Sequence, residues 1–393
     1  MPQIKPEVES FARIKVLGVG GSGKNATNHM INSKVRGVEF IAINTDAQDL
    51  HQSLARKKIH IGKNITKGLG TGMNPELGKK AAEETKEEIQ EALKGADMVF
   101  ISGGTGGGTY SGAAPVIAKV AKELGILTIA VVTKPFSFEG SQRNKIAEQA
   151  IEELKKNVDA IIIIPNDRIL TIVNKETTAK KAFAICDDVL RQAVEGISDL
   201  ITTPGTINTD FADIKTIVEN AGSALMGIGS ATGEKRAAEA ARMAINSPLL
   251  EVSINGAKGV LFSIAGGNDI TLFEIQEAAR IITESIDPNA KVKFGTIYTN
   301  KLRKGEIQIT VIASGFSDVQ NKKSLFQSAG FQKQEEKENK LGKKIPSPAE
   351  IKESKEKKSE STNLNEIKTT AKIEDDGDDW GVIPSFLKRS KIK

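Results

Sequence analysis

Residues 102–115 read SGGTGGGTYSGAAP, a loop that places six glycines between Gly103 and Gly112. The loop follows an apolar run at 96–102 and leads into the helix-like segment AAPVIAKVAKELG. Glycine permits backbone conformations with positive φ and lets a ligand come close to the amide groups. A glycine-rich loop between a strand and a helix is typical of a site that binds phosphate.

A second glycine-rich loop, GVGGSGKNAT at 18–27, follows the apolar run 13–19 and fits three templates. The spacing of Gly18, Gly20 and Gly23 matches the dinucleotide fingerprint, and Asp46 follows the next apolar run at about the expected distance.

The same loop also matches most of a P-loop, because Lys24 follows Gly23, although Asn25 stands where Ser or Thr would coordinate magnesium. The third template is a general phosphate cradle made of backbone N–H groups at a helix N-terminus. All three templates predict that this loop binds phosphate.

Apolar, β-branched runs alternate with helix-like segments along the first part of the chain. Strands with near-continuous apolar sequence are buried on both faces, as in a parallel sheet covered by helices. Segments 75–96 and 142–157 each read as one amphipathic helix. The sequence therefore predicts an α/β, doubly wound parallel-sheet domain. The expected strands are 13–19, 38–44, 96–102, 127–133 and 159–165.

Beyond this domain we expect a long central helix, a smaller α+β C-terminal domain and a disordered tail. Pro204 and Gly205 end the helix, and the composition after Phe316 is rich in Lys, Glu, Ser, Asn and Gln with few apolar residues. The expected boundaries are a flexible N-terminus at 1–12, the first domain at 13–176, the helix at 177–203, the second domain at 204–316, the disordered linker at 317–374 and a C-terminal peptide at 375–393.

Composition excludes several classes of function. The net charge is +5 from 55 basic and 50 acidic residues that are interspersed, so no nucleic-acid partner is expected. No apolar run is long enough for a membrane span, and no signal peptide is apparent, so we expect a cytoplasmic protein. The single Cys186 excludes an internal disulfide, and the three histidines lack the spacing of a zinc site.

Polar residues follow the later strands as well. Glu139 and Arg143 come after the run 127–133, and Asn166 comes after the run 159–165. Ligands of open parallel sheets bind outside the carboxyl ends of the strands, so these side chains are expected on one rim with the two loops. Two loops that face each other can hold a di- or triphosphate from both sides.

Motifs in a fixed order carry a more specific signal: GVGGSGKNA, INTDAQDL, GLGTGMNPELG, GGGTYSGAAPVIA, VVTKPFSFEGSQR, IPNDRIL, AFAICDDVLRQAVEGISDLI and NTDFADIKTI. With these motifs the sequence resembles the tubulin/FtsZ family, most closely the FtsZ of bacterial cell division, over 13–316 and again over 375–389. The resemblance implies a GTPase that polymerises head to tail into filaments of the cell-division ring at mid-cell, with GTP as substrate and Mg²⁺ as cofactor.

The resemblance also implies roles for individual residues. Glu139 would contact the ribose and Arg143 the sugar–phosphate side, with Asn166 on the same rim. The residues that would contact the phosphates are Gly20, Gly21, Ser22, Gly23, Lys24, Asn25, Gly107, Gly108, Thr109 and Tyr110.

Phe183 and Asp187 lie four residues apart and share one face of the central helix. With the resemblance, Phe183 stacks on a purine, and the Asp187 carboxylate accepts hydrogen bonds from N1–H and the 2-amino group of guanine. Adenine offers no such pair of donors. Taken alone, the two residues read as a core Phe and a solvated helix-face Asp.

The segment NTDFADIKTIVEN at 208–220 contains Asn208, Asp210 and Asp213. Taken alone, Asp213 reads as the N-cap of the following helix and Asp210 as a turn residue. The resemblance implies that this loop enters the nucleotide pocket of the next subunit, where the two carboxylates and Asn208 orient a water for attack on the γ-phosphate. Hydrolysis would then require two subunits.

Residues 375–393, DDGDDWGVIPSFLKRSKIK, resemble the family's C-terminal peptide, which docks on membrane tethers and regulators. The chain has no membrane-inserting element of its own, so attachment through a partner is expected.

Two positions depart from the family's pattern. Tyr110 stands in the second loop where glycine is usual, and Met73 replaces another glycine. If position 110 needs positive φ, the tyrosine is strained by about 1–3 kcal/mol; otherwise its ring lies over the nucleotide or in solvent, and turnover is altered. The altered loop suggests one alternative, a nucleotide-binding filament protein with weak or absent hydrolysis. A second alternative, an NAD-dependent oxidoreductase, rests on the first glycine loop and Asp46.

Overall fold

A computed structural model describes residues 12–316 except 172, 175, 204, 251–252 and 300. Ten strands form one sheet in the order β3-β2-β1-β4-β5-β6-β7-β10-β8-β9. Their bounds are β1 Ile14–Val19, β2 Val38–Asn44, β3 Lys57–His60, β4 Met98–Gly104, β5 Leu127–Lys134, β6 Ala160–Pro165, β7 Gly222–Thr232, β8 Gly259–Gly266, β9 Lys291–Tyr298 and β10 Glu306–Ser314.

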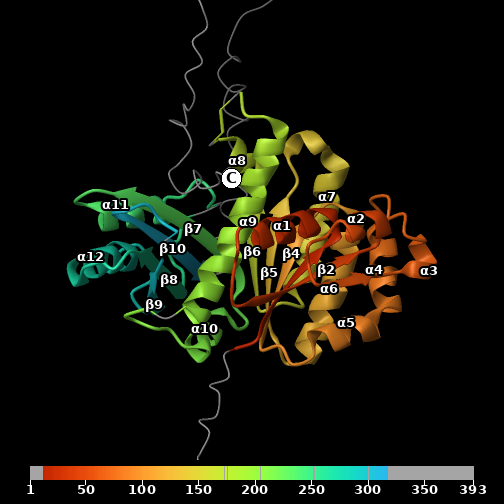
Figure 1. The fold of residues 1–393 in the computed structure, drawn as a ribbon, viewed down its shortest axis with the longest axis horizontal. Helices are drawn as coiled ribbons and strands as arrows, with labels where there is room; N and C mark the ends of the chain where they lie inside the picture. The colour runs from red at the N-terminus through yellow and green to blue at the C-terminus, as the bar shows by residue number, and fades with distance from the viewer. Residues whose placement is uncertain are drawn as a thin grey trace, which may run out of the picture. The chain divides into compact units, whose positions relative to one another are not determined.

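The six strands from β3 to β6 are all parallel, and helices cover both faces of this part of the sheet. Helices α4 to α7 contribute to one core with the strands, while α1 and α9 pack on the other side (Figure 1). The helices are α1 Gly20–Asn32, α2 Ala47–His51, α3 Lys63–Thr66, α4 Pro75–Glu84, α5 Lys86–Leu93, α6 Gly108–Glu123, α7 Ser141–Lys155, α8 Asn166–Leu170, α9 Ala179–Thr202, α10 Phe211–Val218, α11 Arg236–Ile245 and α12 Leu272–Thr283.

The segment 75–96 forms two helices, α4 and α5, where one was expected. The chain leaves the helical conformation at Thr85, which has φ −108° and ψ 22°. The Thr85 hydroxyl donates to the carbonyl of Ala81 at 3.1 Å and accepts from the N–H of Gly62 at 3.2 Å. Threonine competes with the helical backbone in this way, which explains the break.

The C-terminal part of the sheet has mixed directions. β10 pairs antiparallel with β7 on one side and β8 on the other, and β8 pairs parallel with β9. Helices α11 and α12 pack against it and share one apolar core with its strands. Strands and helices therefore both contribute to this part of the chain, as expected for the smaller α+β domain.

The two parts of the sheet meet where β6 pairs with β7. Only three residue pairs form this seam, from Ala160–Gly222 to Ile162–Ala224, and it is the shortest strand pairing in the described sheet. Helix α9 contacts β5 in one part and β9 in the other. The long helix therefore bridges the seam.

The predicted α/β fold with a long central helix and a smaller α+β domain is confirmed. No helix within the described residues is long and apolar enough to span a bilayer. The expected N-terminus 1–12 lies almost wholly outside the described residues, as do the linker and the C-terminal peptide.

Candidate functional site

The first glycine loop joins β1 to α1 and presents the N–H groups of the first turn of α1 at the carboxyl edge of the sheet. Gly20 has φ +71°, and a Cβ placed on it would lie 3.5 Å from Cβ of Thr109 in the second loop. Likewise, Oγ of Ser22 lies 2.9 Å from the position that a Cβ on Gly104 would occupy. The two loops therefore lie close together, and the residues predicted to contact the phosphates are brought to the same edge of the sheet.

Lys24 does not project from this loop as a P-loop lysine does. Its side chain is buried, and Nζ lies 2.7 Å from Oδ1 of Asp49, whose other oxygen accepts from the Asn44 amide at 2.8 Å. Asp46, the acid of the dinucleotide fingerprint, caps α2 by accepting from the Asp49 N–H. The ion pair of Lys24 with Asp49 contradicts the interpretation of this loop as a P-loop. Of the templates that predict a phosphate site, the cradle of backbone N–H groups is the one that remains compatible with the position of Lys24.

The second loop begins α6 at Gly108, with Gly107 as the N-cap residue. The hydroxyl of Thr109 lies 2.7 Å from that of Thr45 and 3.3 Å from that of Thr71. Hydroxyls from three separate loops therefore meet at the start of this helix. Thr109 was among the predicted phosphate contacts, whereas Thr45 and Thr71 were not, although both stand in the motifs INTDAQDL and GLGTGMNPELG.

Tyr110 lies in the core and not over the predicted nucleotide position. It is 3% exposed, and its hydroxyl donates to the carbonyl of Ile101 at 3.2 Å. Its ring lies beside Gly103, where an added Cβ would be 2.2 Å from Cδ2. Tyr110 occupies the third position of α6 and is absent from the residues with positive φ. Both expectations for it, backbone strain and a ring over the nucleotide or in solvent, are wrong.

Backbone strain occurs instead at Met73, the other position that departs from the family's pattern. Met73 has φ +64°, in the left-handed region that favours glycine, and follows Gly72 at φ +55°. Its side chain is partly exposed. The loop from Leu69 to Met73 precedes α4 and carries Thr71 into the hydroxyl group described above. The strain thus lies in a loop that borders the predicted phosphate site.

Glu139 and Arg143 lie together on the rim. Nη1 of Arg143 is 2.9 Å from Oε2 of Glu139, and Oε1 of Glu139 accepts from the N–H of Phe136. Nε of Arg143 is buried and lacks a hydrogen-bond partner among the described residues. The pair is preorganised beside the second loop, because the Arg143 side chain passes within 2.9 Å of a Cβ placed on Gly106.

The start of α9 supplies an aromatic surface and a carboxylate. Phe183 is half exposed and meets Phe136 edge to face at a centroid distance of 5.6 Å. Asn166, at the start of α8, is buried, and its Oδ1 has no hydrogen-bond partner within the described part of the chain. An exposed ring is suited to stacking on a planar base, and the Asn166 oxygen is available to accept a hydrogen bond.

Asp187 and Asp188 are adjacent but have opposite electrostatic environments. Burial raises the pKa of Asp187 to about 7, which the charge of His29 partly offsets. Burial also disfavours ionised Asp188, but hydrogen bonds from His29, Arg191 and Gln192 outweigh it and lower the pKa of this carboxyl to about 2. Asp187 has no hydrogen-bond donor among the described residues, whereas Asp188 has three partners.

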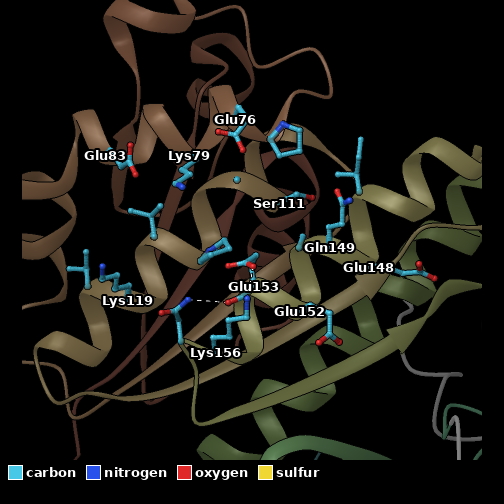
Figure 2. Close-up of a pocket in the computed structure, with 18 of the residues that line it drawn as sticks. Glu76, Lys79, Glu83, Ser111, Lys119, Glu148, Gln149, Glu152, Glu153 and Lys156 are labelled. Carbon is cyan, nitrogen blue, oxygen red and sulfur yellow. Dashed lines mark hydrogen bonds and ion pairs between the residues drawn. The ribbon is translucent and has the colours of Figure 1, made fainter. Parts of the chain in front are cut away.

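Two hollows lie near these helices. A cleft of about 390 Å³ is lined by Phe136, Phe138, Leu170 and Phe183, and therefore borders the aromatic surface, although Asp187 does not line it. A larger groove of about 1150 Å³ runs between α4, α6 and α7 (Figure 2). Its walls mix lysines and glutamates, and it contains none of the predicted nucleotide contacts. The larger groove therefore does not coincide with the predicted nucleotide site.

The remaining predicted residues lie at the opposite edge of the sheet. Asp210 is the N-cap of α10, with Oδ1 accepting from the Asp213 N–H at 2.7 Å, so the expectation that Asp213 is the cap is wrong. Asp213 pairs with Nζ of Lys293 at 2.6 Å. Asn208 accepts from the N–H of Gly205.

The chain after α10 enters β7 at Gly222, opposite the first residue of β6, and so lies at the amino edge of the parallel strands. Helix α9 separates the two groups, with α8 near one end and α10 near the other (Figure 1). Its 24 residues span about 36 Å. One chain does not bring Asp210 and Asp213 to the glycine loops.

No group of three or more His, Cys, Asp or Glu side chains in the described part of the chain is placed to hold a metal ion. The donor chemistry nevertheless fits magnesium bound through phosphates. Mg²⁺ keeps several waters and takes few protein ligands, all of them oxygens. The hydroxyls of Thr45, Thr71 and Thr109 are the oxygen donors at the loops.

Two family models match this chain. Residues 13–174 match the GTPase domain of the tubulin/FtsZ family, and residues 222–317 match the C-terminal domain of the FtsZ family. A solved FtsZ dimer without ligand from M. jannaschii is 44% identical, with a TM-score of 0.75, and the match covers 78% of this chain and 89% of that one. The chain belongs to the tubulin/FtsZ family.

More distantly related solved structures share the fold. CetZ2 from Haloferax volcanii, solved as a GTPγS-bound protofilament, is 21% identical with a TM-score of 0.67, covering 81% of this chain and 99% of that chain. CetZ1 from the same organism, a GDP-bound monomer, is 23% identical with a TM-score of 0.68, and the match covers 81% of this chain and 98% of that chain. Because the chain belongs to the tubulin/FtsZ family, we reject the prediction that its first glycine loop belongs to an NAD-dependent oxidoreductase.

Proposed function

We propose that this member of the tubulin/FtsZ family hydrolyses GTP to GDP and phosphate, and that it does so only in head-to-tail filaments. The observation that carries the proposal is the separation of the predicted site. The phosphate loops lie at the carboxyl edge of the sheet, and Asp210 and Asp213 lie at the amino edge. A second copy stacked end to end would bring one edge to the other.

Nucleotide binding is assigned to the carboxyl edge. The N–H groups that begin α1 and α6 bind the phosphates, since a helix N-terminus favours anions. Glu139 binds the ribose and Arg143 the sugar–phosphate side. Phe183 stacks on the base while ionised Asp187 accepts two hydrogen bonds from guanine, which disfavours ATP. The phosphates and the nearby hydroxyls of Thr45, Thr71 and Thr109 would hold magnesium, which would supply positive charge against the phosphates.

Hydrolysis is assigned to the junction of two copies. Asn208, Asp210 and Asp213 of one copy orient a water against the γ-phosphate held by the next. Phosphoryl transfer depends mainly on position and electrostatics, so delivering these groups to the phosphate starts the reaction. The dimer and the protofilament among the related structures support self-association as a property of such folds.

The cellular role extends this proposal. Filaments of this chain form the cell-division ring at mid-cell in the cytoplasm, held to the membrane by tether and regulator proteins that bind residues 375–393. We further propose that residues 13–176 bind GTP, that 177–203 link the domains, and that 204–316 activate hydrolysis in the neighbouring copy. The alternative of a filament protein with weak or absent hydrolysis is less well supported, because the Tyr110 side chain that prompted it lies in the core.

The test is phosphate release measured with light scattering over a range of protein concentrations, with GTP, ATP or no nucleotide. We expect release that is specific to GTP and appears only above a critical concentration. Asp213→Asn should abolish most of it while GDP binding is retained. Turnover that is proportional to protein concentration down to the lowest values would contradict a site shared by two copies.

Lys293→Met is the matched control, because it breaks the ion pair to Asp213 but keeps the carboxylate. We expect it to retain polymerisation-dependent turnover. If it is as inactive as Asp213→Asn, then the ion pair and not the free carboxylate accounts for the loss.

A further inference from the structure

His29 links the helix that carries the first phosphate loop to the helix that carries the base contacts. It lies in the last turn of α1, and its Nε2 is 3.1 Å from Oδ1 of Asp188 on α9. Both side chains are about one-fifth exposed. A partly buried hydrogen bond to a carboxylate is stronger than an exposed one, so this contact can hold the two helices in register.

Asp188 is fixed from its own helix as well. Nε of Arg191 donates to Oδ1 at 2.8 Å, and Nε2 of Gln192 donates to Oδ2 at 2.6 Å. Both carboxylate oxygens are therefore engaged, and the side chain cannot turn without losing a bond. A carboxylate held this firmly transmits the position of His29 to the backbone of α9.

The adjacent Asp187 has no such support among the described residues, so its position follows from the rotation of α9 about its own axis. A side chain reaches about 6 Å from a helix axis, so a rotation of about 10° moves its tip by about 1 Å. Hydrogen bonds weaken steeply over such changes in distance and angle. The two bonds expected from guanine to Asp187 are therefore sensitive to the orientation of α9.

We propose that His29 is a positioning residue that determines specificity for guanine: its bond to Asp188 fixes the rotation of α9 relative to α1, and with it the place of Asp187 against the base. The proposal rests on the proposed nucleotide function. In this proposal His29 touches neither base nor phosphate, and its hydrogen bond to Asp188 is the contact through which it positions α9.

The experiment compares the affinities of the full chain for GDP and IDP at protein concentrations below assembly. Inosine lacks the 2-amino group, so the ratio of the two affinities reports one of the two bonds to Asp187. His29→Phe keeps a planar ring and removes the hydrogen bond. We expect it to lower the GDP-to-IDP ratio by about tenfold, the effect of one charge-assisted hydrogen bond, mainly through weaker GDP binding.

His29→Gln places an amide nitrogen near the position of Nε2 and should restore the ratio to within about twofold of the unmodified chain. His51→Ala, at the exposed end of α2, is the matched control and should leave the ratio unchanged. A purely structural role would lower both affinities together, along with the midpoint of thermal unfolding, and would leave the ratio unaltered.

Equal loss of GDP and IDP binding in His29→Phe, or no loss of either, would overturn the inference. If His29→Phe does not unfold cooperatively, His29→Ala replaces it with the same two outcomes. Failure of the proposed function looks different: the unmodified chain would then bind neither nucleotide, or would not prefer GDP over IDP and ADP.

Discussion

At the scale of single residues, Asp187 links nucleotide affinity to pH. Burial raises its pKa to about 7, whereas the ionised form is the one that accepts hydrogen bonds from guanine. Below pH 7 the free protein holds a proton that binding must displace. Affinity for GDP should therefore fall as pH is lowered, by about tenfold between pH 8 and pH 6. Calorimetry at several pH values measures it.

The stability of the nucleotide-free protein should change in the opposite direction. A carboxyl whose pKa is higher in the folded than in the unfolded state favours folding when protonated, and this contribution is lost as pH rises through 7. Asp187→Asn is the control for both effects. It should remove most of the pH dependence and shift preference towards XDP, whose 2-carbonyl accepts from an amide. A slope of the same size in this variant would assign the pH dependence to another group.

Replacing Met73 with glycine should make the folded chain more stable. A non-glycine residue in the left-handed region costs about 1–2 kcal/mol, and glycine returns part of that through the greater freedom of the unfolded chain. We expect Met73→Gly to raise the free energy of unfolding by up to about 1 kcal/mol in urea denaturation. Met73→Ala keeps Cβ and should give no such gain. Equal stability of the two variants would show that Met73 is not strained.

At the scale of elements, substitutions of Asp210 at the start of α10 can distinguish its role as a helix cap from its proposed role in catalysis. Asp210 caps the helix through its Oδ1. Asparagine is an equally good cap, whereas alanine costs about 1 kcal/mol. We expect Asp210→Asn to keep the stability of the chain and lose GTP turnover, and Asp210→Ala to lose both. Urea denaturation and phosphate release distinguish them, and full turnover in Asp210→Asn would remove Asp210 from the site.

The elements also show how far sequence patterns reach. The buried parallel strands and α9 were predictable because continuous apolar runs and 3.6-residue periodicity are strong signals. β7 was missed because GSALMGIGSAT is rich in glycine and small residues, and its assignment depends on pairing with β10 and β6. The break at Thr85 depends on a hydrogen bond to Gly62, which is distant in sequence.

The same limit applies within the site. Spacing placed the two glycine loops and the rim residues correctly on the sheet, because strand ends determine where loops lie. It could not show that Tyr110 turns into the core beside Gly103, or that Lys24 pairs with Asp49. Those outcomes depend on contacts between loops that only the folded chain brings together.

At the scale of the whole molecule, a site shared between copies predicts complementation. Asp187→Ala impairs the nucleotide edge, and Asp213→Asn impairs the opposite edge, so each variant alone should be nearly inactive. In an equal mixture, roughly one junction in four joins an intact nucleotide edge to an intact opposite edge, because head-to-tail contacts are heterologous. Phosphate release from the mixture should approach a quarter of that of the unmodified chain. A mixture as inactive as its components would place both residues in one chain's site.

The short seam between β6 and β7 has a consequence for mechanics. Three residue pairs join the two parts of the sheet there, fewer than at any other boundary between described strands. A force that pulls the two parts of the sheet away from each other meets the fewest backbone hydrogen bonds along this line. Helix α9 contacts β5 and β9 and so holds the two parts of the sheet together across this line. The stiffness of the subunit therefore depends on that helix more than on the sheet it crosses.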